Sequence, residues 1–261
     1  MKNALIIFKK EIKEVLKSRS IWVPSIILSL VFAVIMPVAL SVGSSSLLKE
    51  PEMAKLLSKI LPGYDSFTSL IMFLSKQLLV FLLLVPAMIP SLIAPTSITL
   101  EKESRTLESL LATPIKTSEL LLGKTLTSII PAFAISTFNF ILLSVTLDIV
   151  SFPKLGYLFL PNTEWLIIAF ILSPAISFII TMVSITISSR TTDIKAAQGI
   201  GSAIILPIYA IIGMQIGGLF VLNSIYLLVA SFILIALCPI FLKIAIRVFD
   251  RENILTRWKY K

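Results

Sequence analysis

The chain has 261 residues, of which 57% are hydrophobic and only 14% are charged, and its mean hydropathy is +1.00. Soluble domains carry about 25% charged residues, so this chain has too few polar groups to cover a water-exposed surface. We therefore expect one membrane domain, residues 1–261, that is covered by lipid. The net charge of +9 does not indicate nucleic-acid binding, because the basic residues lie beside apolar runs and not in an aromatic-rich stripe.

Five clustered apolar residues lie at helical spacing near the N-terminus, with lysines elsewhere on the helical wheel. They are Leu5, Phe8, Ile12, Val15 and Leu16. This pattern predicts an amphipathic helix that lies in the membrane interface. The alternative is a charged lead-in to the first span.

Six later runs are apolar enough, and long enough, to cross a bilayer as helices of about 20 residues. They cover residues 21–41, 77–100, 125–147, 165–187, 199–222 and 224–246. The sequence therefore predicts an all-α integral membrane fold with six transmembrane helices and both termini on one side.

The basic residues are distributed unequally between the two sides of this arrangement. Of the 23 lysines and arginines, 18 lie in the segments on the side of the termini and five lie on the other side. The positive-inside rule then predicts a cell-membrane protein with cytoplasmic N and C termini. On the exterior side, residues 50–61 form an amphipathic segment that either caps an exit path or only anchors the chain to the outer leaflet.

The residue types that most membrane enzymes need are missing or misplaced. The chain has no histidine, which excludes HExxH metalloproteases and Ser/His dyads, and its one cysteine, Cys238, offers no CxxC motif. Asp148 and Asp193 both fall outside the predicted spans, so an intramembrane aspartyl pair is not expected. We expect no catalytic residues, no metal site and no bound cofactor in this chain.

Gly123, Lys124 and Thr125 imitate the end of a phosphate-binding loop. Such a loop needs a glycine five positions before Gly123, where this chain has Ser118, and it needs a preceding strand, where this chain begins a membrane helix. The sequence therefore predicts that ATP, if it drives the protein, binds to a separate subunit.

The predicted spans contain no acidic or basic residue away from their ends, which argues against an ion-coupled transporter. Asn139 and Gln215 are the main amide side chains at depth, and we expect them to join helices by hydrogen bonds.

Proline and glycine mark two further candidate sites. Pro86, Pro90 and Pro95 bend the second span and can form a hinge beside a transport path. Gly213 and Gly217 form a GxxxG pair in the fifth span, which suits close packing against a second copy of the chain or against a helix of the same chain.

The segment between spans two and three is the most informative one. Its leucines lie on one face of a short helix that Pro114 ends, and Thr117 or Ser118 can cap a new helix with Glu119 in its first turn. The result is a short cytoplasmic helix between two spans, with the shape of a docking element. The docking residues are Glu101, Glu103, Arg105, Leu107, Glu108, Leu110, Leu111 and Pro114.

The run EKESRTLESLLATPIKTSELLLGK resembles the cytoplasmic signature of the ABC-2 type transporter permease family, E-x-E-x-G-T-L-E-x-L-L-x-T-P followed by a Gly-Lys pair. Arg105 stands where the family has glycine. The matching residues are Glu103, Thr106, Leu107, Glu108, Leu111, Thr113, Pro114, Gly123 and Lys124. Residues 191–199 and 205–207 are similar to the family's fifth-span region, more weakly.

The resemblance implies a permease that dimerises and docks two ATP-binding subunits through the short helix, with ATP and Mg on those partners. Export is the expected direction, because the family is mostly exporters. Two other classes stay open: a membrane protein with a structural or assembly role, and an ion-coupled secondary transporter. The sequence does not identify the solute, although the apolar, hydroxyl and amide character of the spans suits an amphipathic solute better than a highly charged one.

Overall fold

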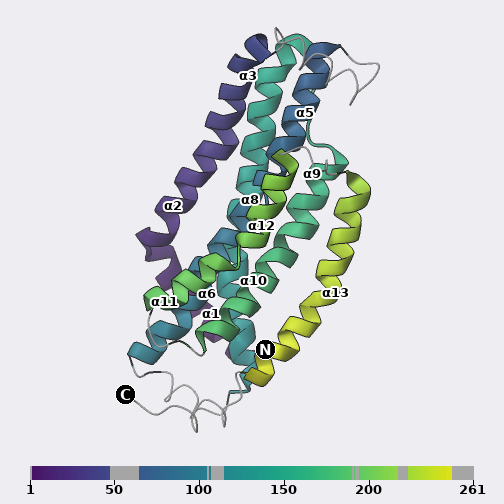
Figure 1. Cartoon of the computed structure of the whole chain (residues 1–261). Helices are drawn as coiled ribbons and strands as arrows, with labels where there is room; N and C mark the ends of the chain where they lie inside the picture. Colours follow the sequence, from purple (N-terminus) through teal and green to yellow (C-terminus); the bar gives the residue numbers. More distant parts are fainter. Residues whose placement is uncertain are drawn as a thin grey trace.

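In the computed structural model, the protein is a bundle of long helices with shorter helices packed against it (Figure 1). The structure describes residues 2–47, 65–104, 106, 115–189, 191, 194–216 and 223–248. The first half of these residues forms α1 (Lys2–Lys17), α2 (Arg19–Leu30), η1 (Val31–Ile35), α3 (Met36–Leu47), α5 (Ser66–Phe81) and α6 (Leu84–Glu103). The second half forms α8 (Thr117–Leu155), α9 (Thr163–Ile167), η2 (Ile168–Leu172), α10 (Ser173–Ser188), α11 (Ile194–Ala203), α12 (Leu206–Ile216) and α13 (Ser224–Val248).

Within the described residues, five helical stretches are long and apolar enough to cross a membrane. They are Arg19–Ala39, Phe67–Glu103, Thr117–Pro153, Thr163–Ser188 and Ser224–Val248. They match five of the six predicted spans, and all regular structure in the described part of the chain is helical. The expectation of an all-α, multi-pass membrane protein is therefore confirmed.

The predicted fifth span, residues 199–222, is not one continuous helix. Its described part is divided into α11 and α12 by a turn at Ile204 and Ile205, directly before Pro207. Proline lacks a backbone N–H and favours the first turn of a new helix, which accounts for the position of the break. Residues 217–222 lie outside the described part, as does the exterior segment 50–61, so the six-span count stays a prediction.

Two widened π-helical segments interrupt the first and fourth spans, and each is followed by a proline. The segment η1 ends two residues before Pro37, and η2 ends two residues before Pro174. A proline ring clashes with the carbonyl four residues earlier, and a π turn widens the helix at that place. The prolines thus change the local geometry of these spans and do not end them.

The centre of the bundle is α6 with the two helices packed against it, α8 and α10. In the apolar 18-residue window of Phe67–Glu103, 83% of the residues are buried, whereas the share is 11% in that of Ser224–Val248. The helix α13 therefore lies at the edge of the bundle with most of its apolar side chains exposed (Figure 1). The helix α1 lies across one end of the bundle, beside the end of α6 and the start of α8. We call this the α1 end.

Candidate functional site

The predicted docking segment leaves the bundle at the α1 end. Glu101 and Glu103 lie in the last turn of α6, and α8 begins at Thr117 with Glu119 in its first turn. The residue at the cap position is Lys116, which makes no side-chain cap hydrogen bond, so the predicted cap at Thr117 or Ser118 is wrong by one or two positions. Six of the predicted docking residues lie outside the described part: Arg105, Leu107, Glu108, Leu110, Leu111 and Pro114.

A buried charge cluster lies directly beneath this segment. The Nζ atom of Lys124 lies 2.6 Å from Oε1 of Glu11 and 3.0 Å from Oε2 of Glu101, and it donates to the backbone carbonyl of Ser97 at 3.2 Å. The Lys124 side chain is fully buried, while those of Glu11 and Glu101 are 8% and 14% exposed. One lysine therefore links α8 to both α1 and α6.

The chemistry of the cluster is set by burial. Burial raises the pKa of the Glu11 carboxyl, because a carboxylate is disfavoured away from water, and the ammonium of Lys124 opposes this effect. A buried ion pair is a weak source of net stability, but removing one partner is costly because the other charge stays buried without compensation. The cluster thus fixes three helices in one arrangement at the place where α6 leads into the docking signature.

Gly123 explains how α1 comes close enough to reach this lysine. A Cβ atom added at Gly123 would lie 2.9 Å from the carbonyl oxygen of Ala4 and 2.9 Å from Cβ of Ile7. Any larger residue would push α1 away from α8. The Gly-Lys pair thus lies inside a helix, whereas a phosphate-binding loop would have to be a loop after a strand. The glycine lets α1 approach α8 closely, and the lysine forms the ion pairs that link α8 to α1 and α6.

The face of α1 that packs on the protein differs from the apolar residues that were predicted to lie in the membrane interface. The buried residues are Ala4, Ile7, Glu11 and Val15, at spacings of three and four residues. Of the predicted apolar residues, only Val15 belongs to this face, whereas Leu5 and Leu16 are 51% and 57% exposed. The helix packs on α8 through one face because Gly123 admits it there, and a second apolar strip stays exposed.

A second lysine in the last turn of α6 holds the end of α10. The Nζ atom of Lys102 donates to the carbonyls of Ser188, Ser189 and Thr191 at 2.9, 2.6 and 2.9 Å. The last carbonyls of a helix lack donors within the helix, and a cation there also balances the negative end of the helix dipole. Adjacent residues, Glu101 and Lys102, thus connect α6 to different neighbours.

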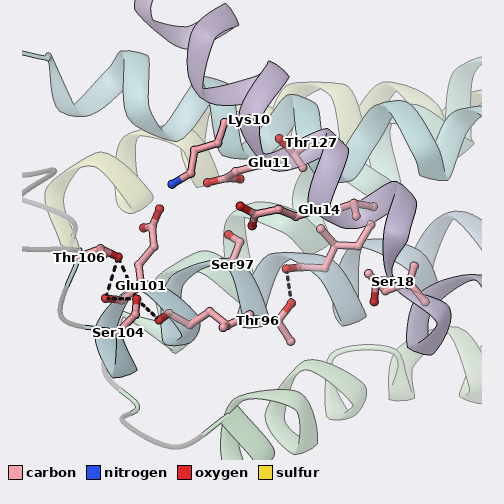
Figure 2. Close-up of a pocket in the computed structure, with 14 residues that line it drawn as sticks. Lys10, Glu11, Glu14, Ser18, Thr96, Ser97, Glu101, Ser104, Thr106 and Thr127 are labelled. Carbon is pink, nitrogen blue, oxygen red and sulfur yellow. Dashed lines mark hydrogen bonds between the residues drawn. The ribbon is translucent and has the colours of Figure 1, made fainter.

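A cavity of about 330 Å³ opens beside the charge cluster, between α1, α2, α6 and α8 (Figure 2). Three carboxylates, those of Glu11, Glu14 and Glu101, point toward one shared space, and the ammonium of Lys10 points toward it from the side (Figure 2). The rest of the wall contains hydroxyl groups and apolar side chains. Sequence reasoning did not predict this cavity.

The predicted hinge prolines all lie in the buried α6 region. A two-residue turn at Leu82 and Leu83 separates α5 from α6, and Leu82 is the residue whose carbonyl Pro86 would obstruct. Pro90 leaves the Pro86 carbonyl without its helical donor, and the Ser177 hydroxyl of α10 donates to that carbonyl at 2.8 Å.

The third proline has a glycine of α11 beside it. Pro95 frees the Ser91 carbonyl from its helical donor, and a Cβ atom added at Gly201 would lie 2.7 Å from that carbonyl oxygen. The prolines therefore shape α6 where α10 and α11 pack against it. That this region acts as a hinge stays a prediction.

The two amides predicted to join helices do so. Asn139 of α8 donates from Nδ2 to the Ser29 hydroxyl of α2 at 2.8 Å, and Gln215 of α12 donates from Nε2 to the Lys76 carbonyl of α5 at 2.6 Å. Gly213 is exposed, and a Cβ atom added there would meet nothing within 4 Å. None of the described residues therefore packs closely against Gly213, and Gly217 lies outside the described part.

A polar group at the opposite end of the bundle holds the connection after α8. Asp148, which lies one residue beyond the predicted third span and still within α8, accepts hydrogen bonds from the backbone N–H groups of Phe159 and Leu160 at 2.9 and 3.0 Å. Lys76 and Glu164 form an ion pair there at 3.6 Å. Asp193 lies outside the described part.

Within the described residues, no three His, Cys, Asp or Glu side chains are placed so that they could hold a metal ion together. The apolar spans and the polar groups gathered at their ends define a multi-pass helical membrane protein. The model of the ABC-2 family transporter protein matches residues 5–233, most of the chain, and the chain therefore belongs to this family. No curated protein matches the sequence.

Proposed function

We propose that this chain is the membrane-spanning permease subunit of an ATP-binding-cassette exporter in the cell membrane. Segment 101–114 docks a separate ATPase subunit, which binds ATP and Mg, and the chain itself holds no cofactor. Family membership supports the permease assignment. The observation that carries the docking assignment is that the last turn of α6, at the start of the signature, has contacts to other helices. Glu101 contacts Lys124 of α8, which also binds Glu11 of α1, and Lys102 holds the end of α10.

The physical argument is that a docked subunit acts on the membrane helices only through contacts that transmit force. A polar loop with no contacts to the spans would move alone. Here, displacement of the α6 end changes the distance between a buried lysine and its carboxylates, and it also pulls on the carbonyls at the end of α10. Changing these contacts is costly inside the bundle, so the helices follow the docking segment.

Co-purification with the ATPase partner tests the docking role. Replacing both Leu107 and Leu111 with aspartate should abolish partner binding, because it removes the apolar face that the sequence predicts for this segment. The control is Leu16→Asp, which introduces one aspartate at a leucine of α1 that is 57% exposed. Undiminished partner binding by the double variant, with a monodisperse purified protein, would overturn the docking assignment.

Coupling is tested separately with Lys102→Met. We expect this variant to retain the partner but to lose solute-stimulated ATP hydrolysis, because the link between the α6 end and α10 is gone. Wild-type stimulation in this variant would show that force reaches α10 by another route.

We further propose that both termini and the α1 end face the cytoplasm, as the charge distribution suggests. In a Cys238→Ser background, an impermeant thiol reagent applied to intact cells should label a cysteine at position 55 but not one at position 116 or 195. Labelling of position 116 from outside would reverse the orientation.

A second copy, or a close relative, completes the transport path in this proposal. The exposed apolar residues of α13 and the open surface at Gly213 support it, since neither is covered by the described residues. A cysteine at Met214, which is 40% exposed, should give a band of doubled mass on crosslinking in membranes. If no such band forms, α12 is not at the dimer axis.

A further inference from the structure

The residues that the structure describes around the cavity of Figure 2 carry more carboxylates than cations. The carboxylates come from Glu11, Glu14 and Glu101. Among the described residues, the cations at the site are Lys10, which lines the cavity, and Lys124, which contacts the carboxylates of Glu11 and Glu101. When all five groups are ionised, one negative charge remains. A ligand with one positive charge would neutralise the site.

One buried oxygen shows where the compensation is incomplete. Glu11 is 6% exposed. Its Oε1 atom accepts a hydrogen bond from the Lys124 ammonium, but its Oε2 atom has no hydrogen-bond partner among the described residues. Unsatisfied buried oxygens are rare because they lose water without replacing it. The pKa of Glu11 is raised even beside Lys124, so a further cation would stabilise the carboxylate.

The remaining wall is suited to hydrocarbon. Val15 and Ile21 line the cavity from α1 and α2, and Ile93 and Leu100 line it from α6. The hydroxyl of Thr96 donates to the carbonyls of Leu92 and Ile93 within its own helix. An apolar group placed against this wall would therefore lose no polar contact.

We propose that this cavity binds a monocationic amphiphile, in which an ammonium head lies among the three carboxylates and an apolar body lies against the walls from α1, α2 and α6. On the proposed transport function, this is the class of solute that the permease takes up from the α1 end. The ammonium can belong to a soluble amine or to the head group of an aminophospholipid.

The alternatives fit the site less well. An anion would add to the excess of carboxylates, and an inorganic cation would leave the apolar wall without a partner. A neutral apolar molecule would leave the Glu11 oxygen uncompensated. A ligand with one positive charge and an apolar body would match both the excess of carboxylates and the apolar wall.

Binding is tested with two probes that share an apolar body, 4-phenylbutylammonium and 4-phenylbutanol. The purified chain is placed in nanodiscs of phosphatidylglycerol, and binding is measured by equilibrium dialysis and by the shift in Tm. We expect saturable binding of the ammonium probe and at least about tenfold weaker binding of the alcohol. Equal binding of both probes would overturn the proposal, because the cavity would then be merely apolar.

Two variants locate the site. Glu14→Gln removes an exposed carboxylate of the cavity outside the buried cluster, and it should weaken ammonium binding about tenfold. The matched control, Glu103→Gln, removes an exposed carboxylate that does not line the cavity and should leave binding unchanged. Thr96→Phe fills the cavity without a change of charge and should abolish binding. Equal effects of the two glutamine variants, or wild-type binding by Thr96→Phe, would place the ligand elsewhere.

Adding phosphatidylethanolamine to the nanodiscs separates the two sources of the ammonium. Competition with the probe identifies the lipid head group, and no competition identifies a soluble amine; both results support the shared chemistry. The ATPase partner is absent from these measurements. Failure of docking by the Leu107 and Leu111 variant would therefore leave the binding result intact, and failure of binding would leave the docking result intact.

Discussion

Replacing Lys124 with methionine should strongly destabilise the protein. Methionine matches the length and volume of the lysine stem but lacks the charge, so the variant leaves Glu11 and Glu101 facing each other without the cation that now lies 2.6 and 3.0 Å from them. Removing one partner of a buried ion pair costs about 3–5 kcal/mol. For a chain of this size, the loss corresponds to a fall in Tm of about 10 °C.

Thermal unfolding of the purified protein, followed by circular dichroism in detergent, measures this change. Lys116→Met is the matched control, because Lys116 is exposed at the start of the same helix and should be worth less than about 1 kcal/mol. A triple variant, Lys124→Met with Glu11→Gln and Glu101→Gln, should recover much of the loss, since it removes the buried charges together. A Lys124→Met protein that melts within about 2 °C of the wild type would refute the buried cluster.

The destabilisation should also depend on pH in a definite direction. Burial already raises the pKa of Glu11 above its ordinary value of 4.5, and the variant removes the cation that opposes this effect. A carboxyl with a raised pKa in the folded state binds its proton more tightly there than in the unfolded state. The Tm difference between variant and wild type should therefore be small below about pH 4.5 and grow as the pH rises. A difference that grows on acidification would contradict the assignment.

Two further predictions concern the contacts of α6. Gly201→Val should cost about 1–3 kcal/mol because its side chain meets the Ser91 carbonyl, whereas Gly199→Val on the same helix faces open space and should change Tm little; equal shifts would argue against the close approach. Ser177→Ala should cost about 1 kcal/mol, because it removes the donor to the Pro86 carbonyl, and Ser177→Thr should retain stability if the hydroxyl is what matters. Both are measured as changes in Tm.

Hydropathy alone located the spans well, because a bilayer imposes length and polarity on each crossing segment independently. The positions at which a spanning helix breaks were harder to predict from the sequence. Pro207 precedes a division into two helices, whereas Pro131 lies inside α8 without interrupting it. The outcome depends on which neighbouring groups satisfy the freed carbonyl, and a single sequence does not name those neighbours.

The charge cluster was missed for a similar reason. Glu11, Glu101 and Lys124 are distant in sequence, and nothing in their local patterns pairs them. One signal was available: Glu11 falls on the same helical stripe as Ala4, Ile7 and Val15, and a carboxylate on a buried stripe requires a buried cation. The apolar residues from Leu5 to Leu16 were assigned to the membrane interface, and the sequence prediction did not ask which residues of α1 face the protein.

The three prolines of α6 constrain how a hinge in this region could move. The carbonyl freed by Pro90 is held by the Ser177 hydroxyl of α10, and the carbonyl freed by Pro95 lies against Gly201 of α11. Bending α6 by itself would open both contacts and leave the Pro86 carbonyl without the Ser177 donor, which is costly inside a bilayer. Lys102 holds the end of α10 as well. The motion of lowest cost therefore moves α6, α10 and α11 together, with the backbone bending at the Leu82–Leu83 turn before Pro86. A displacement of the docking segment would then reach the interior of the bundle as the movement of these three helices as one unit.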